Sequence, residues 1–480
     1  MQNEGWNLEH TYTKLPKVFY RNQKPKPAPT PQMYIFNHQL AKTLGLDSEK
    51  LCVSPQIFAG SELPYGAKPI SQAYAGYQFG HFNMLGDGRA VVLGEQITPN
   101  GSRFDVQLKG SGPTPFSRRG DGYAALLPML REYIVSEAMF YLGIPTTRSL
   151  AVALTGRDVF RENVLQGAVL TRIASSHIRV GTFNYIASFG TYEDTQLLVD
   201  YCIWRHFPEL KNLENRFILL LREVAKLQAK LIAKWQLVGF IHGVMNTDNM
   251  AISGETIDYG PCAFMDIYNP ETVFSSIDTE GRYAFKNQPK MGAWNLSRFA
   301  ESLIPLLNTN KNKAVELAKE EISHYWECYN DNWITGMKTK LGITNSEPED
   351  DKLISELLDL MATYKLDYTN TFRTLCFPIN ETNSLLEIPE FVSWQKKWTA
   401  RLNRQPLNQH QITDIMKQHN PAVIPRNHRV EEALASADEG DISKTHNLLA
   451  TLSTPYEDSE IYSLPPSNET CNGYQTFCGT

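Results

Sequence analysis

His242-Gly-Val-Met-Asn-Thr-Asp-Asn249, followed nine residues later by Asp258-Tyr-Gly260, is the stretch of sequence that decides the fold. In many phosphotransferases, an H-x-D-x-x-x-x-N loop supplies a catalytic base and a metal-binding Asn, and a D-F-G-like segment on the next strand supplies a metal-binding Asp. The His and the Asn keep this spacing, but Val244 stands at the usual base position and cannot accept a proton. Asp248 adds a new carboxylate beside the Asn. The pattern predicts a nucleotide site that keeps its metal ligands and has a displaced base.

The composition is that of an ordinary globular protein. The chain has 480 residues, is 42% hydrophobic and 20% charged, and carries a formal net charge of −6. This charge argues against a dominant surface for nucleic acid or anionic membranes. Neither a basic and apolar leader nor an apolar run of about 18 residues is visible. The seven cysteines contain no C-x-x-C pair, which is typical of free thiols in a reducing compartment. We therefore expect a cytoplasmic protein without nucleic-acid or membrane partners.

The periodicity of the sequence predicts an α+β protein with a protein-kinase-like, two-lobed fold. Apolar spacing indicates a helix over residues 124–142, ended by Gly143, and a longer helix over 214–237 with Gly239 as its terminating residue. Strands are expected at about 90–95, 104–109, 149–154 and 168–173, which gives a strand–strand–helix–strand–strand order.

Four regions follow from this pattern. We expect an N-terminal extension packed on the core (1–80), a small lobe of sheet plus helix (81–185), a larger helical lobe with the catalytic and metal loop (186–440) and a C-terminal tail (441–480).

Lys109 ends an expected strand, and Glu132 lies in the middle of the expected helix 23 residues later. A strand Lys paired with a helix Glu is a device that holds an ammonium group against nucleotide phosphates. A surface Lys and a solvated helix Glu are an equally reasonable interpretation of this spacing alone.

Several other segments could contact phosphates. The turn Gly86-Asp-Gly-Arg89 is too short for a dinucleotide fingerprint, and the loop 111–122 combines glycines, prolines and two arginines. Arg172 and Arg179 could bind phosphate oxygens bidentately or form structural ion pairs.

Asn249 and Asp258 carry the hard oxygen ligands that Mg²⁺ prefers. Asp248 could take a proton from an attacking hydroxyl, or it could simply cap a turn. His242 is expected to brace the loop rather than to react. Cys478, near the end of the chain, is interpreted as an ordinary thiol.

A series of segments along nearly the whole chain resembles the selenoprotein O (YdiU) family of kinase-like protein adenylyltransferases. They are Gln78-Phe-Gly, Leu85-Gly-Asp-Gly-Arg-Ala90, Lys109-Gly-Ser-Gly-Pro-Thr-Pro, Arg118-Arg-Gly-Asp-Gly122, Leu130-Arg-Glu-Tyr, Ser136-Glu-Ala-Met, Leu142-Gly-Ile-Pro-Thr-Thr-Arg148, Arg172-Ile-Ala, the His242–Met250 loop, Asp258-Tyr-Gly-Pro, Gln288-Pro, Trp294-Asn-Leu, Pro425-Arg-Asn-His and Phe477-Cys-Gly-Thr480.

This resemblance implies an enzyme that transfers AMP from ATP, bound in a flipped orientation, to Ser, Thr or Tyr hydroxyls of proteins, releasing pyrophosphate. It also implies Mg²⁺ or Mn²⁺ as the metal, UMP transfer from UTP as a second activity, and self-modification. The implied roles are base for Asp248, metal binding for Asn249 and Asp258, and orientation of Lys109 for Glu132. The implied nucleotide contacts are Gly86, Gly88, Arg89, Lys109, Asp121, Gly122, Arg172, Arg179 and Asp258.

At two positions the resemblance does not fix the role of the side chain. Tyr123 stands where many relatives carry Arg or Lys, and Cys478 occupies the site of a terminal Cys or selenocysteine. Taken without the resemblance, the residues leave three functions open: a protein nucleotidyltransferase, a kinase for a protein or small molecule, and a silent nucleotide-binding scaffold.

Overall fold

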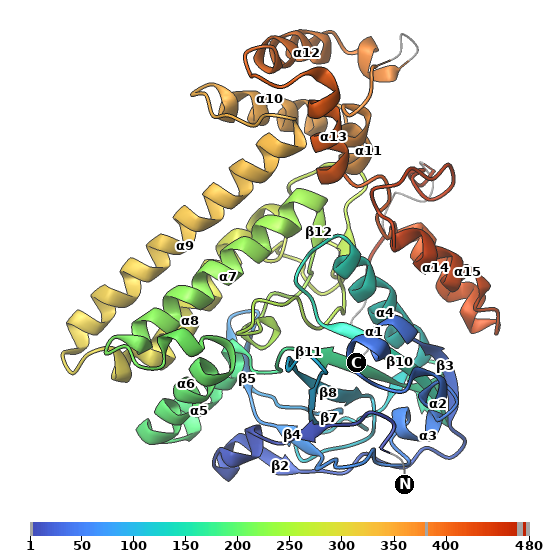
Figure 1. Ribbon diagram of the computed structural model, residues 1–480, viewed down its shortest axis with the longest axis vertical. Coiled ribbons are helices and arrows are strands. Elements are labelled where there is room, and N and C mark those ends of the chain that lie inside the picture. Colours follow the sequence, from blue (N-terminus) through green and yellow to red (C-terminus); the bar gives the residue numbers. More distant parts are fainter. Residues whose placement is uncertain (1–2, 380–382, 468–473, 477–480) are drawn as a thin grey trace.

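The computed structural model describes residues 3–379, 383–467 and 474–476. Its centre is a nine-stranded antiparallel sheet in which β2, β4, β7, β8, β11, β10 and β3 lie side by side, with β1 paired to β7 and β9 to β11 (Figure 1). The strands are β1 (Leu8–Glu9), β2 (Tyr20–Asn22), β3 (Gln32–Phe36), β4 (Ile70–Gln72), β7 (Ala90–Ile97), β8 (Arg103–Lys109), β9 (Ala124–Ala125), β10 (Arg148–Phe160) and β11 (Val164–Ala174). Two small antiparallel pairs lie outside it: β5 (Ala75–Gln78) with β6 (His81–Met84), and β12 (Phe240–Ile241) with β13 (Ala263–Phe264).

The described residues 3–80 supply four strands of the nine-stranded sheet, which the sequence did not predict. The strands β1 to β4 are two to five residues long, which is too short for an alternating pattern to be recognised. The expected regional boundaries stay predictions. The segment expected as a tail begins with helix α15 (Ser443–Leu452), and Cys478 lies outside the described residues.

The two faces of the sheet differ in chemistry, as strand alternation requires. Along β8, Val106 and Leu108 point into an apolar core with the short helices α1 (His38–Thr43), α2 (Ser48–Leu51) and α3 (Pro55–Phe58). Asp105, Gln107 and Lys109 are buried too, but they point to the opposite face. A row of buried polar side chains therefore crosses the middle of the sheet.

The predicted helix over 124–142 is α4 (Leu126–Tyr141), which covers the polar face of the sheet. It begins two residues later than expected because residues 124–125 pair with β11 as β9. Gly143 has a φ of 71°, which suits a residue that ends a helix. Outside α4 lie α14 (Asn427–Asp438) and α15, and the three helices share one apolar cluster.

The remaining helices form the other part of the molecule (Figure 1). The predicted long helix is α7 (Arg216–Val238), and Gly239 ends it with a φ of 73°, as expected. It shares an apolar core with α5 (Val180–Phe189), α6 (Tyr192–His206), α8 (Gln288–Leu307) and α9 (Lys311–Lys340). A second core joins the helices at the far end: α10 (Asp350–Thr363), α11 (Tyr368–Thr374), α12 (Pro389–Leu402) and α13 (Gln409–His419).

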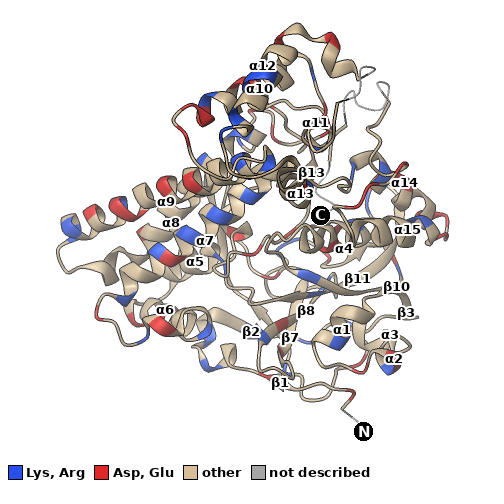
Figure 2. Ribbon diagram, turned by 45° about the horizontal axis from the view of Figure 1, so that its top comes forward, with Lys and Arg blue, Asp and Glu red and all other residues tan. Residues whose placement is uncertain are grey.

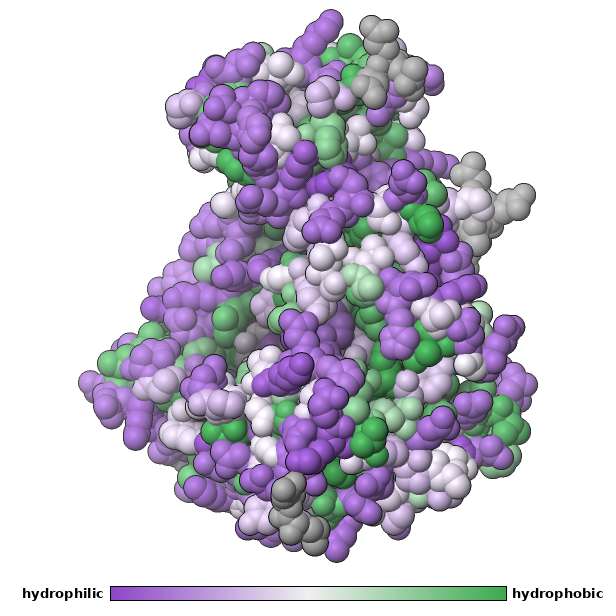
Figure 3. Space-filling model, turned by 45° about the vertical axis from the view of Figure 1, so that its right-hand side comes forward, coloured by the Kyte–Doolittle hydropathy of each residue, from purple (hydrophilic) through white to green (hydrophobic). Residues whose placement is uncertain are grey.

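Acidic and basic residues are interspersed along α9 (Figure 2). The face of the molecule shown in Figure 3 is mostly hydrophilic, and hydrophobic side chains form only scattered patches on it. Among the described residues, no helix combines the length and apolarity that crossing a membrane requires.

Candidate nucleotide and metal site

A cavity of about 930 Å³ lies between the sheet, the β5–β6 hairpin and the loop that follows β12. Eleven of the twelve residues assigned to a site from the sequence line this one cavity: Gly86, Gly88, Arg89, Lys109, Asp121, Gly122, Arg172, Arg179, Asp248, Asn249 and Asp258. The twelfth, Glu132, lies behind Lys109, where both line a neighbouring cavity of about 570 Å³. The structure thus brings the predicted residues together, while their chemical roles stay predictions.

Four charged side chains of the cavity wall and Glu132 behind them form a cluster, which we call the Asp258 cluster. Lys109 Nζ lies 2.6 Å from Glu132 Oε2 and 3.0 Å from Asp258 Oδ1. Arg172 Nη2 lies 2.8 Å from Glu132 Oε1 and 2.6 Å from Asp258 Oδ1, and Arg179 Nη1 pairs with Asp258 Oδ2. Lys109 is therefore paired with Glu132 in the interior, and the interpretation as two solvated surface residues is wrong.

Electrostatics keeps both carboxylates of this cluster ionised. Burial alone would raise the pKa of Asp258, but the charges of Arg172, Lys109 and Arg179 outweigh it and hold that pKa well below its usual value. Burial likewise opposes ionisation of Glu132, and Arg172 and Lys109 together lower its pKa. The backbone of Asp258 is in the left-handed region, with a φ of 62°, a conformation that costs energy for any residue other than glycine.

Asp248 differs from Asp258 in its surroundings. It lies in the single turn η4 (Thr247–Asn249), is buried, and receives no hydrogen bond to Oδ1 from the described residues. Burial raises the pKa of Asp248 to about 6, and the nearby charge of Arg179 opposes this rise only in part. A buried carboxylate with a pKa near neutrality that borders a cavity has the properties of a general base.

Two neighbouring side chains hold the loop around Asp248 in place. His242 is buried, and its Nε2 lies 3.0 Å from the carbonyl oxygen of Ile257, as expected for a residue that braces the loop. Arg179 donates from Nη1 to the backbone oxygen of Asp248 over 2.7 Å, which ties the loop to the Asp258 cluster.

Asn249 and Asp258 fit the requirements of a divalent cation in part. The Asn249 side-chain nitrogen donates to the Val244 carbonyl over 2.9 Å, so its Oδ1 stays available as an oxygen ligand. No cluster of three or more His, Cys, Asp or Glu that could hold a metal ion occurs in the described part of the chain. Two protein oxygens suit Mg²⁺, which usually completes its shell with water and substrate phosphates.

The turn at residues 86–89 is locked to the loop at 114–117. Thr114 Oγ1 donates to the Asp87 carbonyl over 2.6 Å, and Ser117 Oγ donates to the carbonyl of Gly88. A Cβ on Gly86, whose φ is 109°, would lie 2.5 Å from the ring of Phe116. Glycine is therefore required there by both backbone conformation and space.

Asp121 lies at a more exposed part of the cavity wall. Its carboxylate pairs with Arg161, 2.8 Å away, and Gly122 has a φ of 73°. Tyr123 lies under the guanidinium of Arg157, 4.6 Å from the ring centre.

Sequence reasoning missed several residues that line the cavity, among them Tyr74, Asp87 and Arg161. The Tyr74 ring lies 4.5 Å from the Arg179 guanidinium, but it belongs to a region interpreted as an extension. Asp87 lies in the turn that the sequence offered as a possible phosphate contact, but no role was predicted for its own carboxyl group, whose pKa burial raises to about 6. No local motif marks Arg161 as a partner of Asp121.

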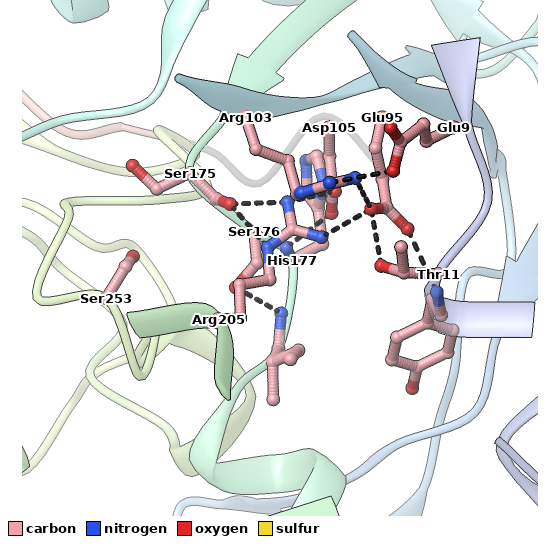
Figure 4. Close-up of polar contacts among 12 residues, drawn as sticks. Glu9, Thr11, Glu95, Arg103, Asp105, Ser175, Ser176, His177, Arg205 and Ser253 are labelled. Carbon is pink, nitrogen blue, oxygen red and sulfur yellow. Dashed lines mark hydrogen bonds and ion pairs between the residues drawn. The ribbon is translucent and has the colours of Figure 1, made fainter. Parts of the chain in front are cut away.

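A second charged cluster lies on the same face of the sheet (Figure 4). We call it the Asp105 cluster; Asp105, Glu95, Arg103, Arg205 and His177 form it. Arg205 lies 2.6 Å from Asp105 and 3.2 Å from Glu95, and Arg103 lies 2.7 Å from Glu95. Asp105 also accepts hydrogen bonds from the backbone and the ring of His177, at 2.9 and 3.1 Å.

Comparison with known proteins gives one family. Residues 4–453 match the family model described as "Protein adenylyltransferase SelO". The chain is similar to a protein named "Protein nucleotidyltransferase YdiU" from a strain of Bacillus cereus, with 59% identity over 482 aligned residues that cover 99% of each chain. Two proteins of the same name, from Bacillus thuringiensis subsp. konkukian and from Bacillus anthracis, are each 58% identical to the present chain, and the alignments again cover 99% of each chain.

Proposed function

Because the chain belongs to the SelO family of protein adenylyltransferases, also named YdiU, we propose that it transfers AMP from ATP to hydroxyl groups of proteins and releases pyrophosphate. The acceptors are Ser, Thr and Tyr side chains, and the enzyme itself is one of its acceptors. UMP transfer from UTP is a second activity of the same site, and Mg²⁺ or Mn²⁺ is the metal.

The proposal includes a protein-kinase-like fold in two lobes. Its support is the order β7, β8, α4, β10 and β11 in the sheet part, with Lys109 on β8 facing Glu132 on α4. The helical part carries the loop with Asp248 and Asn249 directly after β12, and Asp258 follows before β13. This is the arrangement in which a strand Lys, a helix Glu and a metal-binding Asp meet at nucleotide phosphates.

The observation that carries the function is the position of Asp248. It lines the same cavity as Asn249 and Asp258, whereas apolar Val244 occupies the usual base position on that cavity. Burial raises the pKa of Asp248 to about 6, and Oδ1 receives no hydrogen bond from the described residues, so this carboxyl group suits the acceptance of a proton from a substrate hydroxyl.

The reaction follows from these groups. Asp248 takes the proton of the acceptor hydroxyl, and the oxygen attacks the α-phosphorus of ATP. The bond between that phosphorus and the oxygen bridging to the β-phosphate breaks, and pyrophosphate leaves with the electron pair. Lys109, Arg172 and Arg179 are positioned to stabilise the negative charge that develops on the phosphates. Asn249 and Asp258 would hold the metal, which would neutralise further phosphate charge when bound.

Labelled ATP tests the proposal directly. The purified protein, alone and with the proteins of a cell extract, is incubated with Mg²⁺ or Mn²⁺ and ATP labelled at the α- or the γ-phosphate. We expect protein-bound label only from the α-phosphate and an adenylyl mass increment on the enzyme. Asp248→Ala and Asp258→Ala should both abolish the labelling while the variants stay folded. Label retained only from the γ-phosphate would show a kinase instead, and label from neither would show a binding protein.

A further inference from the structure

The Asp248 carboxylate packs against the backbone of Gly76 in strand β5. A Cβ atom placed on Gly76 would lie only 2.0 Å from Asp248 Oδ1 and 2.6 Å from its Cγ. Real carbon atoms do not approach this closely, so the carboxylate occupies space that exists only because residue 76 has no side chain. The φ of Gly76 is not in the left-handed region, so its backbone conformation does not require glycine.

Gly181, the second residue of α5, contacts Asp248 from another direction. A Cβ there would lie 2.1 Å from the Ala75 carbonyl oxygen and 3.1 Å from the Asp248 Cα. Two glycines from segments about 100 residues apart in sequence thus let β5, α5 and the η4 turn approach one another. The common result of both contacts is a narrow slot around Asp248.

The β5–β6 hairpin is also hydrogen-bonded to the loop that carries Asp248. The Tyr77 backbone N–H donates to Thr247 Oγ1 over 3.1 Å. The Phe79 N–H donates to the Tyr283 hydroxyl over 3.3 Å, and this hydroxyl donates to Asn246 Oδ1 over 2.6 Å. The hairpin and the loop therefore hold a fixed register, which keeps Gly76 opposite the carboxylate.

We propose that Gly76 is a positioning residue for adenylyl transfer, which holds the Asp248 carboxylate in the orientation that the reaction needs. The inference rests on the proposed role of Asp248 as the base. Because Oδ1 packs against Gly76, Oδ2 is the oxygen left to meet an acceptor hydroxyl. A side chain at position 76 would rotate the carboxylate away from this position, and its only other printed overlap, 2.8 Å from Leu85 Cδ1, is with the end of a flexible apolar side chain.

The first test separates turnover from nucleotide binding. Gly76→Ala should lower kcat for AMP transfer by about 10²-fold, the cost of misplacing a catalytic group by about 1 Å. The affinity for ATP, measured by calorimetry, should stay within about twofold of wild type, because Lys109, Arg172 and Arg179 are unchanged. A kcat within about twofold of wild type would overturn the proposal.

Gly336→Ala in α9 is the matched control. Its Cβ would lie 2.2 Å from Leu237 Cδ1, a similar overlap with a side-chain end that does not line the cavity. We expect this variant to lose thermal stability and to keep its kcat. An equal loss of kcat in both variants would show that crowding anywhere in the fold has the same effect, which contradicts a specific role for Gly76.

A double variant tests the contact without any activity measurement. Gly76→Ala should lower Tm in the wild-type background and should lower it much less in an Asp248→Ala background, because the carboxylate that it displaces is absent. An equal loss of Tm in both backgrounds would overturn the proposal. If Gly76→Ala alone cannot be purified, a folded double variant supports the contact and an unfolded one refutes it. Absence of AMP transfer by the wild type would instead refute the proposed function, with the Tm coupling still measurable.

Discussion

The Asp258 cluster and the Asp105 cluster both contain side chains of β8 that point to the same face of the sheet, but the surroundings of the two clusters differ. Lys109 on β8 belongs to the first and Asp105 to the second. Between them, the segment after β11 contributes Arg179 to the Asp258 cluster and His177 to the Asp105 cluster, and β11 itself contributes Arg172 to the first. One cluster borders a cavity of about 930 Å³, whereas the other is enclosed by β7, α6 and the N-terminal segment.

The two clusters also differ in their numbers of cations and carboxylates. The Asp258 cluster pairs three cations, Lys109, Arg172 and Arg179, with two carboxylates, Glu132 and Asp258. The surplus positive charge borders the cavity, where a polyphosphate would compensate it.

In the Asp105 cluster, Arg205 and Arg103 pair with Asp105 and Glu95, and Arg103 also pairs with the half-exposed Glu9, so the cations do not outnumber the carboxylates. Burial lowers the pKa of His177, so this histidine is neutral near pH 7 and adds no positive charge. This cluster, which we call balanced because it has no surplus cation, thus has the character of a structural support, and the one with a surplus has the character of a binding site.

The largest effect we expect is on activity when the surplus charge is removed. Lys109→Met should lower AMP transfer by about 10²- to 10³-fold, as expected for the loss of one preorganised charge at a transition state. The free energy of unfolding should change little, since Glu132 keeps Arg172 and Asp258 keeps both arginines as partners. Steady-state kinetics and chemical denaturation of the same preparation check both parts. A large loss of stability would place Lys109 among the structural groups.

The matching change in the balanced cluster should act in the opposite way. Arg205→Met leaves Asp105 without its guanidinium partner in a buried place, which should cost about 3–5 kcal/mol of unfolding free energy. The fraction that stays folded should transfer AMP at close to the wild-type rate, because Arg205 lies outside the cavity. Denaturation with urea and activity per folded molecule are the measurements. Little loss of stability with a large loss of turnover would break the distinction between the clusters.

Metal binding should depend on the nucleotide, because three cations surround the Asp258 carboxylate. A divalent cation alone would meet this surplus charge, whereas ATP would compensate it. We expect Mn²⁺, followed by electron paramagnetic resonance, to bind roughly 5- to 150-fold more tightly with a non-hydrolysable ATP analogue than without it, the usual range of a coupling between two sites. Equal affinity in both conditions would show that the surplus charge does not govern the metal site. Asp258→Asn should remove metal binding in either case.

The sequence pointed to the members of the Asp258 cluster because they belong to local motifs. Lys109 and Glu132 are separated by a strand, a loop and a helix, and Asp248, Asn249 and Asp258 lie within 11 residues. Motif spacing and helix periodicity made these residues candidates, but the spacing alone left a buried Lys109–Glu132 pair and two solvated residues equally reasonable, and only the structure decides between them.

The Asp105 cluster could not be predicted in this way. Asp105 and Arg205 are 100 residues apart, and the Tyr12 backbone N–H donates to Glu95 from 83 residues away in the sequence. The same reason applies to Gly76, which the sequence did not single out. Its role depends on how closely the β5–β6 hairpin approaches η4, and a glycine in a short strand can equally mark a bulge or a tight bend.

The smallest effect, and the sharpest test of the comparison, concerns pH. Burial raises the pKa of Asp87, which lines the cavity, to about 6. In the balanced cluster, Arg205 and His177 outweigh the effect of burial, and the pKa of Asp105 falls to about 2. The ordinary value for an unfolded chain is about 3.9. Folded protein therefore keeps the Asp87 proton up to about pH 6, and its stability falls as the pH rises from about 4 to above 6. Asp105 acts with the opposite sign: its contribution is complete above about pH 4 and is lost as the pH falls towards 2.

Asp87→Asn should consequently stabilise the protein more at pH 8 than at pH 5. Asparagine keeps an oxygen that can accept the Gln72 N–H, whose donor now lies 2.9 Å from Asp87 Oδ2, but it has no proton to lose. From the two pKa values, the advantage should grow by about 1 kcal/mol between pH 5 and pH 8. Asp105→Asn in a His177→Gln background is the control. Asp105, with a pKa of about 2, is ionised at both pH values, and the His177 ring, whose pKa depends on Asp105, is absent, so the cost of losing the carboxylate should stay constant. Urea denaturation of the two variants and their parent proteins at the two pH values decides the matter. Parallel behaviour of both variants would mean that the cavity and the enclosed cluster hold their carboxylates in the same way, and the contrast between binding site and support would fail.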